Sequence, residues 1–338
     1  MNILLTSAGR RTYMVEYFQK AIEPYGGEVF ALNSDINAPA LWKADHFEVC
    51  PLIYDPSYAN FLFDYCQSNQ IELVVPLYDI ELPVLSRLKS KFLKNNIRIL
   101  VGEEWLTEMA NDKWLTQNFL HKHNFSTVPC FLSLEAFVDS YRQNEISFPV
   151  YVKPRWGMGS LSLYKAENLE ELKFFFGLVK KEVRRGTLRF ESQKDFESSV
   201  IIQAVLPGQE FGLDIINDLE GNYCNTIVKK KLGMRSGETD CAITIRHEIL
   251  SLLGQKLASI TKHPGNIDAD VFLDGDEAYV LELNPRFGGG YPFSHRAGVN
   301  LPEAIVSWCL EINVPKNTLD YNEGVLSMKG IEMIDRHD

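Results

Sequence analysis

The chain has 338 residues, more than twice the usual length of one domain, so we expect two or three domains. Hydrophobic residues make up 45% and charged residues 23% of the chain, a globular balance that excludes wholesale disorder. The 34 Lys and Arg against 45 Asp and Glu leave a net charge of −11, which argues against a protein that coats nucleic acid or an anionic membrane.

The sequence shows no signal for export or for insertion into a membrane. Its first residues lack the basic region and the long apolar region of a secretory leader. No apolar run approaches the roughly 20 residues that span a bilayer. The six cysteines form no C-x-x-C pair and no cluster with histidine at zinc spacing. We therefore expect reduced thiols and a cytoplasmic protein.

The first hundred residues alternate between predicted strands and helices, which is typical of a doubly wound parallel sheet. Strands are predicted at 2–6, 28–32, 71–76 and 97–101, and helices at 13–22, 57–68 and 80–94. The first turn contains one glycine where a dinucleotide fingerprint needs three, so we expect no NAD site. Arg10 and Arg11 in this turn suggest an anionic group on a ligand, although arginines beside a surface turn are common.

The pattern changes after about residue 110. Helices are predicted at 111–123, 169–183, 250–261 and 302–310, and a strand at 150–154. The charged stretch 180–199 lacks apolar periodicity and predicts an exposed excursion. From residue 200 onward, strands at 200–206, 211–217 and 223–231 predict an antiparallel arrangement, and the strands at 268–273 and 278–283 predict a hairpin.

A first candidate site follows the strand at 150–154. Lys153 lies near the end of this strand, and the loop 155–162 contains Gly157 and Gly159, whose backbone N–H groups can face an anion. The loop is not a P-loop, because no G-x-x-x-x-G-K-[ST] occurs in the chain. Taken alone, a loop of this composition is most often only a turn.

A sharper signal comes from the predicted hairpin. Strand alternation points Glu282, Asn284 and Arg286 to one face, beside Asp270 on the neighbouring strand. Carboxylate and amide oxygens suit Mg²⁺ that bridges nucleotide phosphates, and an arginine can hold a phosphoryl or carboxylate oxygen. Any one of these residues can belong to a solvated polar face. Together, directly before the glycines 288–290, they favour a functional site.

A third candidate is the basic run Lys229–Lys231 with Arg235. Alternation places Lys229 and Lys231 on one side of a strand, and the segment 235–238 reads as a loop that faces a substrate. A solvated charged face is an equally good interpretation.

Several motifs follow one another in a recognisable order: Asp112-Lys113, Val152-Lys153-Pro154 with its loop, Gln203 to Glu210, Asp270, and Glu282-Leu283-Asn284-Pro285-Arg286. With these motifs the sequence resembles the ATP-grasp superfamily of carboxylate–amine ligases, and most closely its stand-alone members similar to the carbamoyl-phosphate synthase large subunit. The resemblance implies an ATP-grasp fold of mixed α/β and α+β class. The implied domains are a pre-ATP-grasp Rossmann-like domain at 1–110, a linker helix and small lid subdomain at 111–199, and an antiparallel-sheet catalytic subdomain at 200–338.

The resemblance also implies roles for individual residues. ATP would contact Lys113, Lys153, Gly157, Met158, Gly159, Ser160, Gln203, Ala204, Val205 and Glu210. One or two Mg²⁺, or Mn²⁺, would be bound by Asp270, Glu282 and Asn284, and the transferred phosphoryl group or the acceptor by Arg286, Lys231 and Arg235. Ala204 departs from the pattern, since many relatives have a carboxylate there, and Asp268 competes with Asp270 as a metal ligand. The acceptor pocket would draw on Ser7, Arg10, Arg11, Tyr78, Asp79, Glu81, Tyr291 and His295.

The implied reaction is an ATP- and Mg²⁺-dependent ligation in which a small carboxylate becomes an acyl phosphate and is joined to an amine, giving ADP and phosphate. Two alternatives stay open: phosphorylation of carbamate or bicarbonate, as in half of the carbamoyl-phosphate synthase reaction, and a catalytically silent nucleotide-binding regulatory protein. The expected partners are therefore ATP, a small carboxylate and an amine, with no nucleic acid and no membrane. The family also suggests a homodimer.

Overall fold

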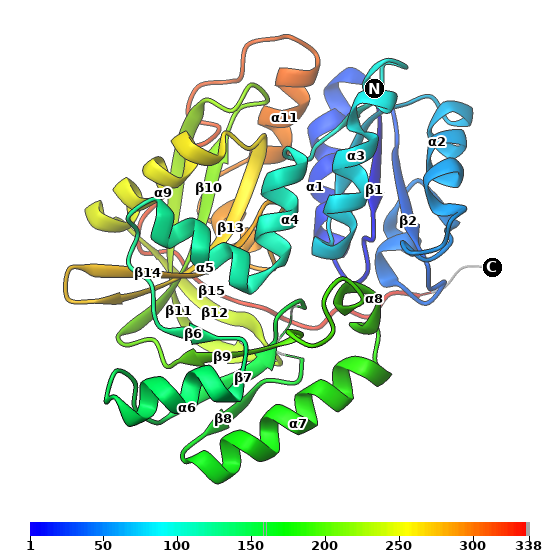
Figure 1. Cartoon of the computed structure of the whole chain (residues 1–338). Coiled ribbons are helices and arrows are strands. Elements are labelled where there is room, and N and C mark those ends of the chain that lie inside the picture. Colours follow the sequence, from blue (N-terminus) through cyan, green and yellow to red (C-terminus); the bar gives the residue numbers. More distant parts are fainter. Residues whose placement is uncertain (158, 160, 336–338) are drawn as a thin grey trace.

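The structure of the protein is a computed structural model that describes residues 1–157, 159 and 161–335. Within these residues the named strands form three sheets, one parallel and two antiparallel (Figure 1). Such a mixed architecture confirms the predicted α/β and α+β class.

The parallel sheet occupies the N-terminal part and has the strand order β3-β2-β1-β4-β5. Its strands are β1 (Asn2–Thr6), β2 (Val29–Asn33), β3 (His46–Val49), β4 (Ile71–Pro76) and β5 (Arg98–Ile99). Because successive side chains of a strand point to opposite faces, Ile3 and Leu5 pack beneath α1 (Thr12–Ile22), whereas Leu4 packs with α2 (Tyr58–Ser68) and α3 (Leu82–Leu93). Helices on both faces confirm the predicted doubly wound sheet.

A four-stranded antiparallel sheet lies at the far end of the molecule from the chain's N-terminus (Figure 1). Its strand order is β6 (Cys130–Phe131), β9 (Val200–Ala204), β7 (Val150–Pro154) and β8 (Tyr164–Ala166). The helices α6 (Leu134–Arg142) and α7 (Leu169–Arg185) cover it through a core that includes Phe137, Leu172 and Val179. Since β9 pairs with β7, residues 200–204 belong to this sheet and not to the antiparallel sheet predicted from residue 200.

The largest sheet has six strands in the order β14-β13-β10-β11-β12-β15. They are β10 (Gln209–Asn217), β11 (Tyr223–Arg235), β12 (Glu238–Ile245), β13 (Gly265–Asp274), β14 (Glu277–Asn284) and β15 (Leu326–Met328). One face packs on α9 (Glu248–Thr261), and on α4 (Glu104–Asn111) and α5 (Lys113–Lys122). On β13 the residues Ile267, Ala269 and Val271 face this core, so Asp268 and Asp270 point to the opposite face.

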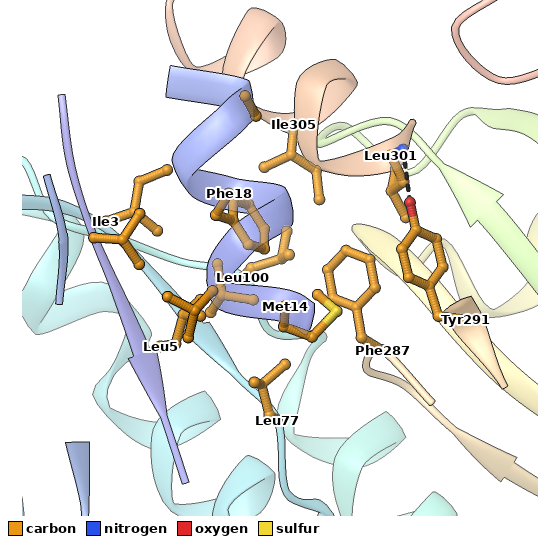
Figure 2. Packing of buried hydrophobic residues seen from close by; sticks show 14 of the residues in the cluster. Ile3, Leu5, Met14, Phe18, Leu77, Leu100, Phe287, Tyr291, Leu301 and Ile305 are labelled. Atoms are coloured by element: carbon orange, nitrogen blue, oxygen red, sulfur yellow. Dashed lines mark hydrogen bonds between the residues drawn. The ribbon is translucent and has the colours of Figure 1, made fainter. Parts of the chain in front are cut away.

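One hydrophobic core joins the parallel sheet to the C-terminal segment of the chain. Figure 2 shows Phe287 and Tyr291 packed beside Met14 and Phe18 of α1, with α11 (Leu301–Cys309) completing the contact. The Tyr291 side chain belongs to α10 (Tyr291–Arg296), and its hydroxyl accepts a hydrogen bond of 2.9 Å from the backbone N–H of Leu301. This shared core holds the first turn of the chain next to the six-stranded sheet.

The stretch 180–199 differs from its prediction. Helix α7 runs on to Arg185, and the short helix α8 (Arg189–Ser192) lies against the N-terminal domain. The Phe190 ring stacks on Tyr54, and the buried Glu191 carboxylate accepts hydrogen bonds from the Tyr54 hydroxyl and from Asn111 Nδ2, the latter at 3.0 Å. The predicted exposed excursion is therefore wrong for α8, because its partners lie far away in the sequence.

No helix in the described ranges is long and apolar enough to cross a membrane.

Candidate active site

Two cavities meet on the polar face of the six-stranded sheet. The inter-sheet cavity lies between this sheet and the four-stranded sheet, and the junction cavity lies where the six-stranded sheet faces the parallel domain. They share Gly159, Gly237, Asp270 and Glu282. A molecule in one cavity can therefore react with a molecule in the other beside these two carboxylates.

The inter-sheet cavity combines apolar walls with two lysines. Its lining consists of Lys113, Tyr151, Lys153, Pro154, Gly157, Gly159, Leu161, Leu163, Gln203, Ala204, Val205, Leu206, Glu210, Met234, Gly237, Asp270, Phe272, Leu281 and Glu282. Apolar side chains from both sheets suit an apolar ring, and ammonium groups suit an anionic tail. The cavity thus fits a molecule that has both an apolar ring and an anionic tail.

The two lysines of this cavity have no carboxylate partner among the described residues. Lys153 Nζ donates to Gln203 Oε1 at 2.6 Å, and Lys113 Nζ donates to the backbone oxygen of Gly157. Burial lowers the pKa of both lysines, and the charge of Lys113 helps to lower the pKa of Lys153 to about 8. Two ammonium groups held in this way favour an anionic ligand, because an anion stabilises their charged forms.

Local structure explains where Lys113 lies. The side chain of Asp112 caps α5 by accepting hydrogen bonds from the backbone N–H groups of Trp114 and Leu115, at 2.9 and 3.2 Å. The same carboxylate binds Arg155 Nε at 2.8 Å, which ties the start of α5 to the loop after β7. Asp112 thereby sets Lys113 beside that loop.

Acidic and amide side chains gather on β13 and β14, where the antiparallel register pairs Asp270 with Glu282 and Asp268 with Asn284. Lys231 Nζ bridges Asp270 Oδ1 at 2.6 Å and Glu210 Oε1 at 2.7 Å. Burial opposes the charge of Lys231, but the two carboxylates outweigh it and raise the pKa of the lysine. Burial raises the pKa of Asp270 to about 7. The charge of Lys231 lowers this pKa, and the charges of Glu282 and Asp268 raise it further.

This donor set fits a magnesium ion that arrives with a phosphate. No three His, Cys, Asp or Glu side chains in the described part of the chain are arranged to hold a metal ion by themselves. Mg²⁺ is usually bound by one or two carboxylates together with phosphate oxygens and water. Glu282 accepts one long hydrogen bond, 3.5 Å from Asn284 Nδ2, and forms no close ion pair with any cation of the described residues, although its charge partly offsets the lowering of the pKa of Lys113 and Lys153 by burial. Asp270 lines both cavities, whereas Asp268 lines only the junction cavity, which favours Asp270 as the second carboxylate.

Arg286 occupies the junction cavity and is held by the parallel domain. Its Nη2 lies 2.6 Å from Asp79 Oδ2, and its Nη1 lies 3.4 Å from Asp268 Oδ2. Burial opposes the charge of Arg286, and Asp79 and Asp268 outweigh it and raise the pKa of the guanidinium. Gly288 has no side chain to obstruct this arrangement, since a Cβ there would lie 2.1 Å from the carboxylate of Asp268.

Most of the predicted site residues come together around these cavities. Lys113, Lys153, Gly157, Gln203, Ala204, Val205 and Glu210 line the inter-sheet cavity, Lys231, Asn284 and Arg286 line the junction cavity, and Gly159, Asp270 and Glu282 line both. Met158 and Ser160 lie outside the described residues. Arg235 is the exception: its side chain is 51% exposed, pairs with Asp240 at 2.6 Å and lines neither cavity, so the structure does not support a catalytic role.

Of the residues predicted for the acceptor pocket, some line the junction cavity and others do not. Arg11, Tyr78 and Asp79 line the junction cavity, whereas Arg10 is exposed and Glu81 and Tyr291 are buried away from it. Sequence reasoning missed Glu238, which also lines the cavity. Glu238 is the last residue of the predicted loop 235–238, but the sequence cannot show which residue of that loop faces the site.

Two family models match separate parts of the chain. Residues 3–100 match the model described as PylC-like, N-terminal domain, and residues 196–332 match the model described as ATP-grasp in the biosynthetic pathway with Ter operon. The second range contains β9 and all six strands of the six-stranded sheet, including Glu210, Asp270 and Glu282 of the cavity linings.

Solved structures share the fold over nearly the whole chain. The biotin carboxylase domain of 2-oxoglutarate carboxylase from Hydrogenobacter thermophilus, in complex with MgADP, ADP and bicarbonate, is 16% identical with a TM-score of 0.71, covering 96% of this chain and 72% of that one. N5-carboxyaminoimidazole synthetase from Staphylococcus aureus, complexed with ADP, is 15% identical with a TM-score of 0.70 (97% and 79%). L-amino acid ligase from Bacillus licheniformis is 18% identical with a TM-score of 0.64 (95% and 75%). At these identities the similarity establishes the fold.

Proposed function

We propose that this chain, whose residues 196–332 match an ATP-grasp family model, is an ATP- and Mg²⁺-dependent ligase that joins a small carboxylate to an amine. The observation that carries the proposal is the meeting of two cavities at Asp270 and Glu282. A nucleotide in the inter-sheet cavity would present its terminal phosphate at these carboxylates, and an acceptor in the junction cavity would meet it there. The products would be ADP, phosphate and the compound in which a new C–N bond joins the carboxylate to the amine.

The inter-sheet cavity supplies what a nucleotide needs. Lys113 and Lys153 would bind the phosphates, and the backbone at Gln203 and Val205 would contact the adenine edge. Glu210 would hold the ribose hydroxyls while Lys231 keeps its carboxylate in place at 2.7 Å. Ala204 offers no side-chain acceptor to the adenine amino group, so base recognition falls to the backbone.

The reaction would run through an acyl phosphate. An oxygen of the substrate carboxylate attacks the γ-phosphorus, the bond to ADP breaks, and ADP leaves with the electron pair. The amine nitrogen then attacks the acyl carbon, phosphate leaves, and the amine loses a proton. Arg286 and Lys231 would hold the transferred phosphoryl group from the junction side. Asp270, Glu282 and Asn284 would hold magnesium, which would neutralise the negative charge of the phosphates.

Product analysis tests this proposal. The full chain is incubated with ATP, Mg²⁺ and a panel of small acids, including bicarbonate, with and without amines, and ADP plus phosphate is measured against AMP plus pyrophosphate. ADP release that requires both an acid and an amine supports the ligase. AMP release contradicts the acyl-phosphate route, ADP release with bicarbonate alone supports the half-reaction, and tight ATP binding without turnover supports a regulatory protein.

The proposal also includes Mn²⁺ as a substitute for Mg²⁺ and a homodimeric state. Titration of ADP release with each metal tests the first, and light scattering of the purified chain tests the second.

A further inference from the structure

The guanidinium of Arg11 is the one cation of the junction cavity that lacks a carboxylate partner within the described residues. Its Nη1 donates to the backbone oxygen of Leu77 and, at 3.2 Å, to that of Phe287. The other cations of this cavity are compensated: Arg286 by Asp79, Lys229 by Asp214, and Lys231 by Asp270 and Glu210. The positive charge of Arg11 is therefore available to a ligand.

Only one edge of this guanidinium is free to bind. Because both hydrogen bonds of this guanidinium use Nη1, the edge formed by Nε and Nη2 has no partner in the described part of the chain. This edge offers two parallel N–H groups in one plane, which matches the two oxygens of a carboxylate. Burial and the nearby charge of Arg286 lower the pKa of Arg11, and the carboxylates of Asp79 and Glu238 offset this only in part, so an anion at this edge would stabilise the charged guanidinium.

Arg11 lines the junction cavity but not the inter-sheet cavity. It comes from the turn between β1 and α1, on the wall of the parallel domain that also carries Tyr78 and Asp79. Asp270 and Glu282, which the two cavities share, lie on the opposing six-stranded sheet. A group bound at Arg11 would thus lie against a different wall of the cavity from a group that receives phosphate beside Glu282.

We propose that Arg11 binds a carboxylate of the substrate that does not react. The substrate in the junction cavity is accordingly a small molecule with a carboxylate besides its reacting group, such as a dicarboxylic acid or an amino acid. The description of this carboxylate as non-reacting rests on the proposed ligase function, whereas its binding by Arg11 stands on the geometry alone.

Direct binding tests the proposal without turnover. The probes are succinate, glutarate and L-glutamate, each compared by calorimetry with the compound that lacks one carboxylate: butyrate, pentanoate and 4-aminobutyrate. We expect the full chain to prefer the first member of at least one pair. In R11Q, whose amide still donates to a backbone carbonyl, we expect roughly 10- to 100-fold weaker binding of the preferred probe and unchanged binding of its counterpart. R10Q, which alters the exposed neighbouring arginine, should bind like the wild type.

Three results would overturn the proposal: no preference within any pair, a preference that R11Q retains, or an equal loss in R10Q. If R11Q does not fold, R11K replaces it; lysine keeps the charge but cannot offer the planar edge, so weaker binding is again expected. Tighter, Arg11-dependent binding of 3-phosphonopropionate than of succinate would assign the site to phosphate and reject the carboxylate. If the wild type shows no preference but releases ADP in an acid-dependent way, only the role of Arg11 is rejected. If the wild type shows a preference that depends on Arg11 but releases no ADP, only the ligase function is rejected.

Discussion

The two cavities are built in different ways. The inter-sheet cavity takes its polar residues from short motifs on neighbouring strands, such as Lys153 on β7 and Gln203 on β9. The junction cavity is closed by contacts between distant parts of the chain: Arg11 meets Phe287 across 276 positions, and Asp79 meets Arg286 across 207. A sequence therefore indicates the inter-sheet cavity more readily than the junction cavity, because more of its residues fall in short motifs that can be recognised locally.

The cavities also differ in how their charges are satisfied. Lys113 and Lys153 donate to an oxygen of a neutral group and keep their charge for a ligand. Arg286 in the junction cavity is held in an ion pair, which fixes its position before any substrate binds. We infer that the inter-sheet cavity is arranged for charge neutralisation and the junction cavity for orientation.

The largest effect is expected where the cavities meet. In E282Q the carboxylate shared by both cavities becomes a neutral amide, and we expect acid-dependent ADP release to fall by at least about a thousandfold, because magnesium binding and phosphoryl transfer both depend on it. The matched control is E277Q, at the exposed start of β14, which should release ADP at the wild-type rate. Comparable activity of E282Q and E277Q would reject the metal assignment.

A substitution in the junction cavity alone should separate the two cavities. In D79N the ion pair with Arg286 becomes a neutral hydrogen bond, so we expect kcat/KM for the acid to fall about 10- to 100-fold. The Kd of ATP should not change, since Asp79 does not line the inter-sheet cavity.

D79E restores the charge and should recover part of the loss, and D276N in the exposed hairpin turn is the control. An equal loss of ATP affinity in D79N would show that the cavities are not independent.

The local pattern of the sequence was enough to predict much of the fold and several residues of the candidate site. Alternation on β13 and β14 placed Asp270, Glu282 and Asn284 on one face, and the register confirms that these residues lie together there. It failed for α8, because the burial of Glu191 depends on Tyr54, 137 positions away. It also failed for Arg235, where a turn reverses the chain and brings Glu238 to the cavity instead. Long-range contacts and turn geometry carry information that periodicity does not contain.

The inter-sheet cavity alone should respond to pH through Lys153. Its pKa of about 8 means that the ammonium is charged at pH 7 and mostly neutral at pH 9, so the Kd of ATP should rise about tenfold over that interval. K153R keeps its charge throughout and should flatten the profile. Calorimetric titration of ATP at several pH values measures both, and a flat wild-type profile would contradict the assignment of Lys153 to the phosphates.

The smallest effect on catalysis is expected at the contact between α8 and the parallel domain, which lies outside both cavities. Y54F removes the hydroxyl that donates to Glu191 but keeps the ring stacked on Phe190. The buried carboxylate is then left with Asn111 as its partner, so we expect the free energy of unfolding to fall by about 1 to 3 kcal/mol with little change in kcat. Urea denaturation measures the loss, and Y25F, at an exposed tyrosine, is the control. A stable Y54F with impaired ADP release would instead place α8 in the catalytic cycle and extend the acceptor side of the molecule beyond the junction cavity.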